Sequence, residues 1–208
     1  MMQPLCAPRP VCSSAADSRQ HQPHPVETDL ASADNPNLPR FVTTMPHATF
    51  STPLGTCAIA WSEAGLTRFL LPDPERPPVG NTDAEPPPWV AEIIARVKRH
   101  LAGDAQDFSD VHYDFTLVPE FVRGVLRATL AIRSGCTATY GELAVAIGAT
   151  AAASRAVGSA LGDNPWPLLI PCHRVVAAGG KMTGFSGPGG VATKVRLLAL
   201  EGAQLISE

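Results

Sequence analysis

The sequence predicts an α+β fold: a small N-terminal sheet-plus-helix domain, then a mostly helical C-terminal domain with a helix-turn-helix and a short active-site sheet and loop. Two observations predict this order. Short β-favouring stretches separated by turn residues lie between residues 41 and 71, and apolar residues recur at helical spacing from Trp89 onward. We expect a disordered tail over residues 1–40, an N-terminal domain over 41–116 and a C-terminal domain over 117–208.

The N-terminal domain is predicted to hold an antiparallel sheet covered by one helix. Proline- and glycine-containing turns separate the three predicted strands, and a proline-rich loop precedes the helix. Apolar residues in that helix recur every three or four positions, so one of its faces can cover the sheet. The strands are expected at 48–51, 56–61 and 67–71, the turns at 53–55 and 63–65, and the helix at 89–101.

Three helices are predicted in the C-terminal domain before the active-site segment. An apolar stripe predicts the first, which starts with a proline. A capping box opens the second, a glycine ends it, and the third follows directly, so the second and third resemble a helix-turn-helix. The helices span 119–135, 140–147 and 151–161, with the capping box at Thr139 and Glu142 and the glycine at Gly148.

The third of these helices carries almost only small side chains and one long cation, Arg155. Such a helix can simply pack closely against its neighbours. Alternatively, its backbone can approach another polymer closely, with Arg155 as the protruding probe. Readout of the major groove needs several long polar side chains, so their absence favours shallow or minor-groove contact with little dependence on base sequence.

Charge is distributed unevenly along the chain. The net charge is −3, yet from residue 121 onward eight Lys or Arg outnumber four Asp or Glu, which gives +4 there and leaves −7 for the rest. A basic C-terminal half suits a polyanionic partner, although a solvated basic face has the same composition. The chain contains no apolar run of the ~18 residues that a membrane span requires, so we expect a cytoplasmic protein without a membrane partner.

Five cysteines form an odd set without a CxxC pair, which argues against a disulfide framework or a four-ligand zinc site. Cys172 is the most informative of them. Alone, a cysteine in the apolar stretch IPCHRVV (170–176) is usually a small core residue. Pro171, however, removes a strand hydrogen bond, so we expect the strand to stop there and the thiol to be accessible at a cavity or edge.

An imidazole close to a thiol can take its proton, either directly or through one water. His173 is the candidate base, although neighbours on a strand point to opposite faces, so it needs a turn or a bridging water to act. Glu201, just before Gly202 at the end of the last predicted helix, is a candidate for fixing the tautomer of His173. A solvated acid at a helix end is the alternative interpretation of Glu201.

Together these motifs resemble the methylated-DNA–protein-cysteine methyltransferases, also called O6-alkylguanine-DNA alkyltransferases. The resemblance is continuous from about residue 117 to 204, weaker over 41–116, and does not cover the tail. The motifs occur in the family's order and at nearly its spacing: TYGELA (139–144), SRAVG (154–158), Asn164-Pro165, IPCHRVV (170–176), GFSG (184–187) and LLALEG (197–202).

The resemblance implies a suicide DNA-repair protein that acts once per molecule. Cys172 takes the methyl or larger alkyl group from guanine O6, less readily from thymine O4, as a permanent thioether. His173 acts as the base through a water, Glu201 orients it, and Asn164 braces the site. No metal or cofactor is implied, and the expected partner is double-stranded DNA containing O6-alkylguanine, bound by a monomer.

For DNA contact, the resemblance implies that Arg155 fills the gap left when the target nucleotide is flipped out of the duplex, because O6 is unreachable inside it. Tyr140 is implied in two roles: it helps to rotate the nucleotide, and it donates a proton to the guanine ring. The remaining implied DNA-contacting positions are small residues, namely Ala151, Ala152, Ser154 and Gly158.

For the substrate pocket, the resemblance implies that the backbone amide of Ser186 donates to O6. The carbonyls of Cys172 and Val175 accept from the guanine amino group, and Pro167 and Phe185 form apolar walls. These contacts select guanine over adenine. The chain departs from the shorter family form after Ser186, where Pro188-Gly189 lengthens the loop, so the resemblance does not specify the width of the pocket.

Two other functions remain open from the residues. A non-catalytic sensor of alkylated DNA, or a DNA-binding regulator, would use the same helix pair, although related sensors lack the acceptor thiol. A cysteine hydrolase would use Cys172 and His173, and would leave Arg155 and the small-residue helix without a role.

Overall fold

The N-terminal sheet has three antiparallel strands in chain order, β1 (His47–Thr52), β2 (Gly55–Ser62) and β3 (Gly65–Leu70). The computed structural model describes residues 45–76 and 85–203, so the predicted tail over 1–40 lies outside the described residues. Both turns predicted between the strands are confirmed. The sheet therefore follows from the turn signals and the β-favouring runs between them.

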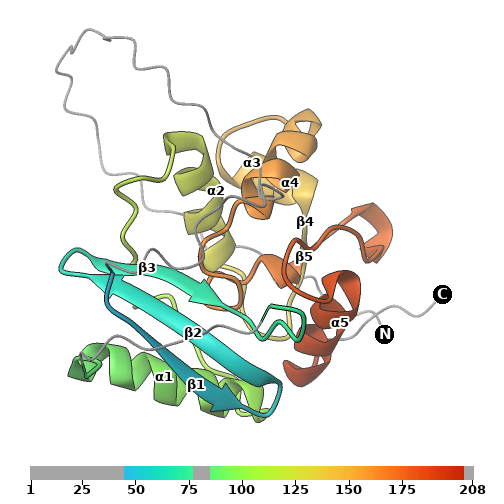
Figure 1. Cartoon of the computed structure of the whole chain (residues 1–208). Coiled ribbons are helices and arrows are strands. Elements are labelled where there is room, and N and C mark those ends of the chain that lie inside the picture. Colours follow the sequence, from blue (N-terminus) through green and yellow to red (C-terminus); the bar gives the residue numbers. More distant parts are fainter. Residues whose placement is uncertain (1–44, 77–84, 204–208) are drawn as a thin grey trace, which may run out of the picture.

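Helix α1 (Pro88–Leu101) lies along one face of this sheet, as Figure 1 shows. Its apolar stripe is buried, which confirms the predicted amphipathic helix: Val90, Ile93, Val97 and Leu101 are each at most 4% exposed. Lys98, Arg99 and His100 lie in its last turn, where the helix dipole favours positive charge. Of these three, only His100 is buried.

The C-terminal part is mostly helical and lies beyond β3 (Figure 1). Helix α5 lies at one end of the molecule, whereas α2, α3 and α4 pack against one another. Strands β4 and β5 form a two-residue parallel pair. The elements are α2 (Glu120–Leu130), β4 (Ala138–Thr139), α3 (Tyr140–Ala146), η1 (Ala151–Ala153), α4 (Ser154–Gly162), η2 (Cys172–Arg174), β5 (Val175–Val176), η3 (Ala178–Gly180) and α5 (Gly190–Leu200).

Two helix boundaries differ from the sequence prediction by more than two residues. Helix α2 ends at Leu130, not at Gly135, because the intervening segment turns back: the amides of Ala131 and Ile132 bond to carbonyls three residues earlier. The helix predicted over 151–161 begins as the 3₁₀ turn η1 before α4. The predicted capping box at the start of α3 is confirmed in both of its hydrogen bonds.

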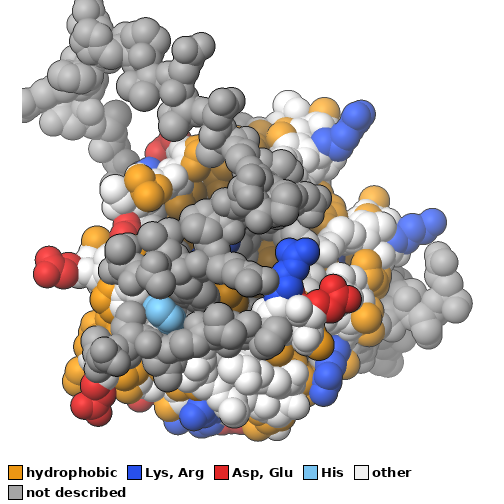
Figure 2. Space-filling model, in the orientation of Figure 1, with side chains coloured by type: hydrophobic (Ala, Val, Ile, Leu, Met, Phe, Trp, Pro, Cys, Tyr) orange, Lys and Arg blue, Asp and Glu red, His pale blue; other side chains and the backbone are white. Residues whose placement is uncertain are grey.

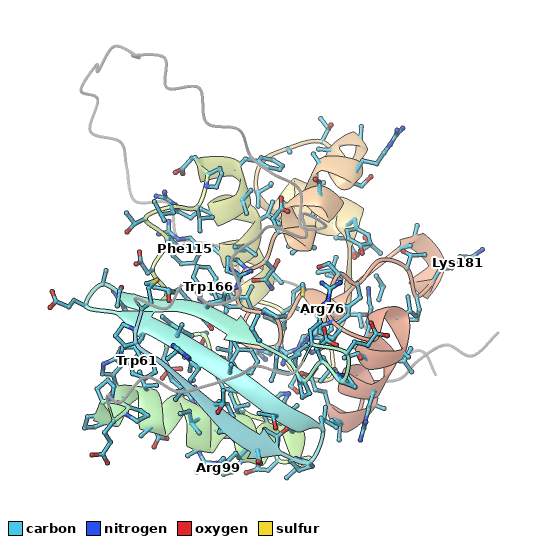
Figure 3. The ribbon with its side chains drawn as sticks, viewed as in Figure 1. Trp61, Arg76, Arg99, Phe115, Trp166 and Lys181 are labelled. Atoms are coloured by element: carbon cyan, nitrogen blue, oxygen red, sulfur yellow. The ribbon has the colours of Figure 1, made fainter. Side chains whose placement is uncertain are left out.

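The two predicted domains share one continuous set of buried residues. At their contact, the ring of Trp166 lies edge-on to Phe115 at a centroid distance of 5.1 Å, and both are labelled in Figure 3. Trp166 also lies edge-on to Tyr113, at 5.2 Å. The backbone amide of Phe69 in β3 donates to the carbonyl of Pro165. The sheet therefore supports the loop that begins at Asn164, and the boundary near residue 116 stays a prediction.

No helix among the described residues is long and apolar enough to cross a membrane.

Candidate active site

The segment that carries Cys172 turns sharply at Pro171. The amide of Cys172 donates to the carbonyl of Ile170 at 2.8 Å, and Pro171 has φ −81° and ψ 63°, which is an inverse γ-turn. Cys172 then opens the 3₁₀ turn η2, which leads into β5. Pro171 thus interrupts the extended chain, as expected, and the turn removes the strand geometry that would have placed Cys172 and His173 on opposite faces.

Asn164 holds both ends of the loop before this turn. Its side-chain amide donates to the carbonyl of Ile170 at 3.0 Å, and its side-chain oxygen accepts from the amide of Trp166 at 3.0 Å. Within the loop, Leu168 has φ 76°, a left-handed conformation that is uncommon for leucine. Asn164 therefore braces the backbone on which the thiol depends, and it also stabilises the thiolate.

The thiol of Cys172 is buried, with the residue 8% exposed, so the expectation of an accessible thiol is wrong. Pro171 turns the side chain inward instead of toward an open edge. Burial raises the pKa of Cys172, while the Asn164 side chain, the positive charge of Lys194 and two backbone amides oppose this effect. The thiol consequently stays protonated near neutral pH and requires a base to become a nucleophile.

His173 is fully buried and bonded to Glu201, with Nε2 at 2.8 Å from Oε1. Since a carboxylate only accepts, Nε2 carries the proton and Nδ1 has the free lone pair. Nδ1 has no hydrogen-bond partner among the described residues. Burial lowers the pKa of His173, the bonded carboxylate of Glu201 partly offsets this, and the imidazole is therefore neutral and able to accept a proton.

Glu201 is positioned by the end of α5. Gly202 adopts φ 69°, and the amides of Gly202 and Ala203 donate back to Ala199 and Leu198, which is a Schellman motif. Only a residue that tolerates a left-handed backbone can end the helix in this way, so the glycine after Glu201 fixes where its carboxylate points.

The carboxylate of Glu201 is held by several donors. Arg174 donates from Nε to Oε2 and from Nη2 to Oε1, both at 2.8 Å, and a further donation from Nη1 reaches the carbonyl of Ile132 at 2.5 Å. Burial alone would raise the pKa of Glu201, but the contact with His100 and the hydrogen bonds from His173 and Arg174 outweigh burial and hold that pKa far below its usual 4.5. Glu201 is therefore ionised throughout the neutral range.

Tyr140 and Lys194 lie close together, with Nζ of Lys194 5.9 Å from the centroid of the Tyr140 ring. The hydroxyl of Tyr140 donates to the carbonyl of Thr183 at 3.2 Å, and burial, followed by the charge of Cys172, raises its pKa, so the phenol stays protonated. Lys194 is fully buried, and its Nζ donates to the carbonyls of Val175, Thr183 and Gly184 at 2.5, 2.9 and 3.3 Å. This lysine therefore ties β5 to the loop that precedes α5.

The residues predicted to form the substrate pocket differ in their exposure to solvent. Val175 is buried, Pro167 and Phe185 are half-buried, and Ser186 is exposed and donates from Oγ to the carbonyl of Gly162 at 3.0 Å. The carbonyl of Val175, expected to accept from guanine, already accepts from Lys194. It could accept from guanine only through its second lone pair.

The helix-turn-helix presents a surface of small residues with one cation. Ala151, Ala152 and Arg155 are exposed, whereas Ser154 and Gly158 are half-buried. Arg155 makes no ion pair or hydrogen bond with any residue in the described ranges, and a Cβ on Gly158 would lie 3.7 Å from the ring of Tyr140. In Figure 2, most visible Lys and Arg side chains lie on the side of α4 and α5, and most visible acids lie on the opposite side.

Three residues of the site around Cys172 and Glu201 were not predicted from the sequence: His100, Arg174 and Lys194. Arg174 lay inside a quoted motif and Lys194 stood among apolar residues on a predicted helix, so their positions offered a signal. His100 offered none beyond its place near the end of an amphipathic helix. Its contact with Glu201 joins residues 101 positions apart, which periodicity does not reveal.

A cavity of about 1140 Å³ lies elsewhere, between the C-terminal end of α2, the loop after α1, and α3. It is lined by apolar residues such as Leu130 and Leu143, and by Arg174. None of the predicted substrate-pocket residues lines it.

Several known proteins are similar to this chain in sequence and in fold. The family model for the 6-O-methylguanine DNA methyltransferase DNA-binding domain matches residues 120–203. A methylated-DNA–protein-cysteine methyltransferase of Mycolicibacterium paratuberculosis is 39% identical over 155 residues, which cover 74% of this chain and 91% of that protein. One from Methanothermobacter thermautotrophicus is 34% identical over 153 residues, covering 74% and 83%. The crystal structure of Mycobacterium tuberculosis OGT in complex with DNA has a TM-score of 0.61 and 35% identity, covering 75% and 92%.

Proposed function

The chain belongs to the methylated-DNA–protein-cysteine methyltransferase family, which repairs DNA by transferring an alkyl group to a cysteine, and we propose that Cys172 is the acceptor in this chain. One observation carries the assignment. The buried Cys172 is followed directly by a neutral His173 whose Nε2–H is fixed on Glu201, which leaves Nδ1 as the free base. This is the arrangement that activates a thiol whose pKa is raised by burial.

The proposed reaction is a displacement at the alkyl carbon of O6-alkylguanine. The thiol proton moves through a water to Nδ1 of His173, and the sulfur lone pair forms an S–C bond as the C–O6 bond breaks. The electron pair of that bond stays on guanine, and the Tyr140 hydroxyl supplies a proton to the ring. Exchange with solvent then removes the proton from His173 and restores the Tyr140 hydroxyl. Overall, one proton, equivalent to that of the thiol, replaces the alkyl group on guanine, so the balance needs no co-reactant.

The reaction uses each protein molecule once. A thioether carbon is a poor electrophile, so the S–C bond to Cys172 is not broken again and the thiol is not regenerated. Stoichiometric rather than repeated turnover follows. O4-alkylthymine reacts less readily in this proposal, because it lacks the guanine amino group.

DNA binding is assigned to the helix-turn-helix. The exposed small residues of η1 and α4 let the backbone approach a minor groove, and Arg155 is free to enter the base stack when the damaged nucleotide rotates out. The partner is double-stranded DNA containing O6-alkylguanine, bound by a monomer. A cytoplasmic location also stays a prediction.

Single-turnover assays test the proposal. Duplex DNA with one O6-methylguanine is mixed with excess protein to measure the rate of methyl loss, beside duplexes with O4-methylthymine or no lesion. A second experiment with DNA in excess over protein measures how many methyl groups each protein molecule removes. We expect methyl loss from O6-methylguanine to stop at one equivalent per protein when DNA is in excess. Binding without methyl loss would indicate a sensor instead, and continued turnover with recovery of free thiol would indicate a hydrolase.

A further inference from the structure

Glu201 has a third partner that comes from the N-terminal part of the molecule. His100, in the last turn of α1, places Nε2 at 3.1 Å from Oε1 of Glu201, the same oxygen that His173 and Arg174 contact. The side chains of His100 and Glu201 are each 1% exposed. A contact in such surroundings is little screened by solvent.

The backbone fixes the protonation of His100. Its Nδ1 accepts a hydrogen bond from the amide of Gln106 at 3.0 Å, so Nδ1 carries no proton. Nε2 must then carry it, because an unprotonated nitrogen at 3.1 Å from a carboxylate oxygen would set two lone pairs against each other. The N–H points off the line to Oε1, which makes the interaction a short electrostatic contact and not a well-aligned hydrogen bond.

The ionisable groups around this contact are few. Glu201 faces His173 and Arg174 from η2 and His100 from α1, and the ring of Phe108 covers His100 at a centroid distance of 5.6 Å. Three N–H groups therefore share Oε1. Those of His100 and Arg174 offset part of the negative charge of Glu201 that favours the protonated form of His173. All three restrict where the carboxylate can lie.

We propose that His100 is a positioning residue for alkyl transfer: its Nε2–H holds Glu201 in place and, through Glu201, sets the orientation and basicity of His173. The proposal rests on the function assigned above to Cys172 and His173. It extends the proton path of the acceptor thiol into the N-terminal domain, and gives α1 a part in the chemistry in addition to covering the sheet.

Two substitutions separate the two contacts of His100. In His100→Gln the side-chain amide nitrogen takes the place of Nε2, which keeps a donor toward Glu201 and loses the acceptor for Gln106. In His100→Asn the side-chain oxygen takes the place of Nδ1, which keeps the acceptor for Gln106 and loses the donor. The two variants therefore make opposite predictions for a role through Glu201 and a role through the Gln106 loop.

The test measures single-turnover methyl transfer from O6-methylguanine DNA between pH 5 and 8. We expect His100→Asn to lower the rate at pH 7 about tenfold, as for loss of one donor to a charged acceptor, and His100→Gln to stay within about twofold of wild type. The acid limb of the rate in His100→Asn should move to higher pH, because Glu201 regains negative charge and raises the pKa of His173. Equal rates and equal acid limbs for His100→Asn and wild type would overturn the proposal, and so would loss in His100→Gln alone.

A measurement on the unmodified protein guards against a variant that fails to fold. Imidazole ¹⁵N spectra at pH 7 should show both His100 and His173 as neutral Nε2–H tautomers, and an Nδ1–H tautomer for His100 would contradict the proposal. Failure of the function assigned to Cys172 is distinguishable, because it would appear as absence of methyl transfer in the wild-type protein itself.

Discussion

At the scale of single residues, His173 determines how the reaction responds to pH. Its pKa lies below the usual 6.5 because burial disfavours the imidazolium. The free base is therefore present at pH 6.5 and is lost only at lower pH. Cys172, by contrast, has a raised pKa, so its deprotonation depends on this base throughout the neutral range.

The lowered pKa of His173 predicts how the reaction rate depends on pH. The single-turnover rate of methyl transfer should stay nearly constant from pH 7.5 down to 6.5 and fall only below that, as His173 becomes protonated. Rates over pH 5–8 with O6-methylguanine DNA check it, with DNA binding measured at each pH as the control. A rate that already falls by half between pH 7.5 and 6.5 would contradict the neutral, low-pKa imidazole.

Arg155 is tested by comparing two substrates. Arg155→Ala should lower the rate on duplex DNA at least about tenfold, because filling the gap in the base stack offsets part of the cost of flipping, a few kcal/mol. The rate with the free base O6-benzylguanine should change little, since no nucleotide is flipped. Arg196→Ala, which removes an exposed arginine from α5, is the matched control. Equal losses on both substrates would show that Arg155 acts on the pocket and not on the duplex.

At the scale of elements, α5 contributes two buried charges to the site, Lys194 within the helix and Glu201 at its end. Lys194 binds three carbonyls of β5 and the following loop, and its charge stabilises the thiolate of Cys172. The helix is thus the element that joins the loop proposed to contact guanine to the proposed proton path.

Lys194→Met should therefore loosen the loop and slow the chemistry. Methionine fills a similar volume but leaves three carbonyls without their donor and raises the pKa of Cys172, so we expect transfer to slow by at least about tenfold. Faster hydrogen exchange at residues 183–187 should accompany the slower rate. Arg196→Met, on the exposed face of the same helix, should change neither quantity. An unchanged exchange rate in Lys194→Met would contradict the role of Lys194 in holding the loop against β5.

Elements with local signals were predictable from sequence, and long-range contacts were not. The turns of the sheet, the stripe of α1 and the capping box of α3 each depend on residues a few positions apart. The segment at Cys172 also carried its own signal, since Pro171 predicts the interruption. Burial of the thiol was mispredicted because it depends on packing of the loop from Asn164, which local sequence does not specify.

Long-range contacts also limited the prediction of the side chains that surround Glu201, namely His100, His173 and Arg174. Glu201 was a candidate partner for His173 through its place before Gly202, and the structure joins them. That His100, Arg174 and His173 share one carboxylate depends on α1, η2 and α5 meeting, which is a property of the tertiary fold. The hydrogen bond from Lys194 to the Val175 carbonyl could not be predicted for the same reason.

At the scale of the whole molecule, this cluster joins the two predicted domains. Removing one partner from a buried, paired charge typically costs about 3–5 kcal/mol, because the remaining charge is left without compensation. The cluster therefore links repair chemistry and stability: the groups that orient His173 also hold α1, η2 and α5 together.

Stability should accordingly decline in acid in two steps. The pKa values of His173 and Glu201 are both lower in the folded state, so the unfolded chain binds more protons and unfolding becomes easier as pH falls. The decline should start below pH 6.5, where unfolded histidine gains its proton, and steepen below 4.5, where unfolded glutamate does. Urea unfolding at a series of pH values measures it. Glu63→Gln, at an exposed acid in the turn between β2 and β3, is the control, and a free energy of unfolding that is flat from pH 7 to 5 would contradict the buried neutral imidazole.

The central claim is that Cys172 receives the alkyl group. Mass spectrometry of peptides, after incubation with duplex DNA that carries an isotopically labelled O6-methyl group, tests it most directly. The account predicts one labelled methyl group on the peptide that contains Cys172, none on the peptides with Cys57 or Cys136, and no label in a folded Cys172→Ser protein. Label on another residue, or repair by Cys172→Ser, would contradict it.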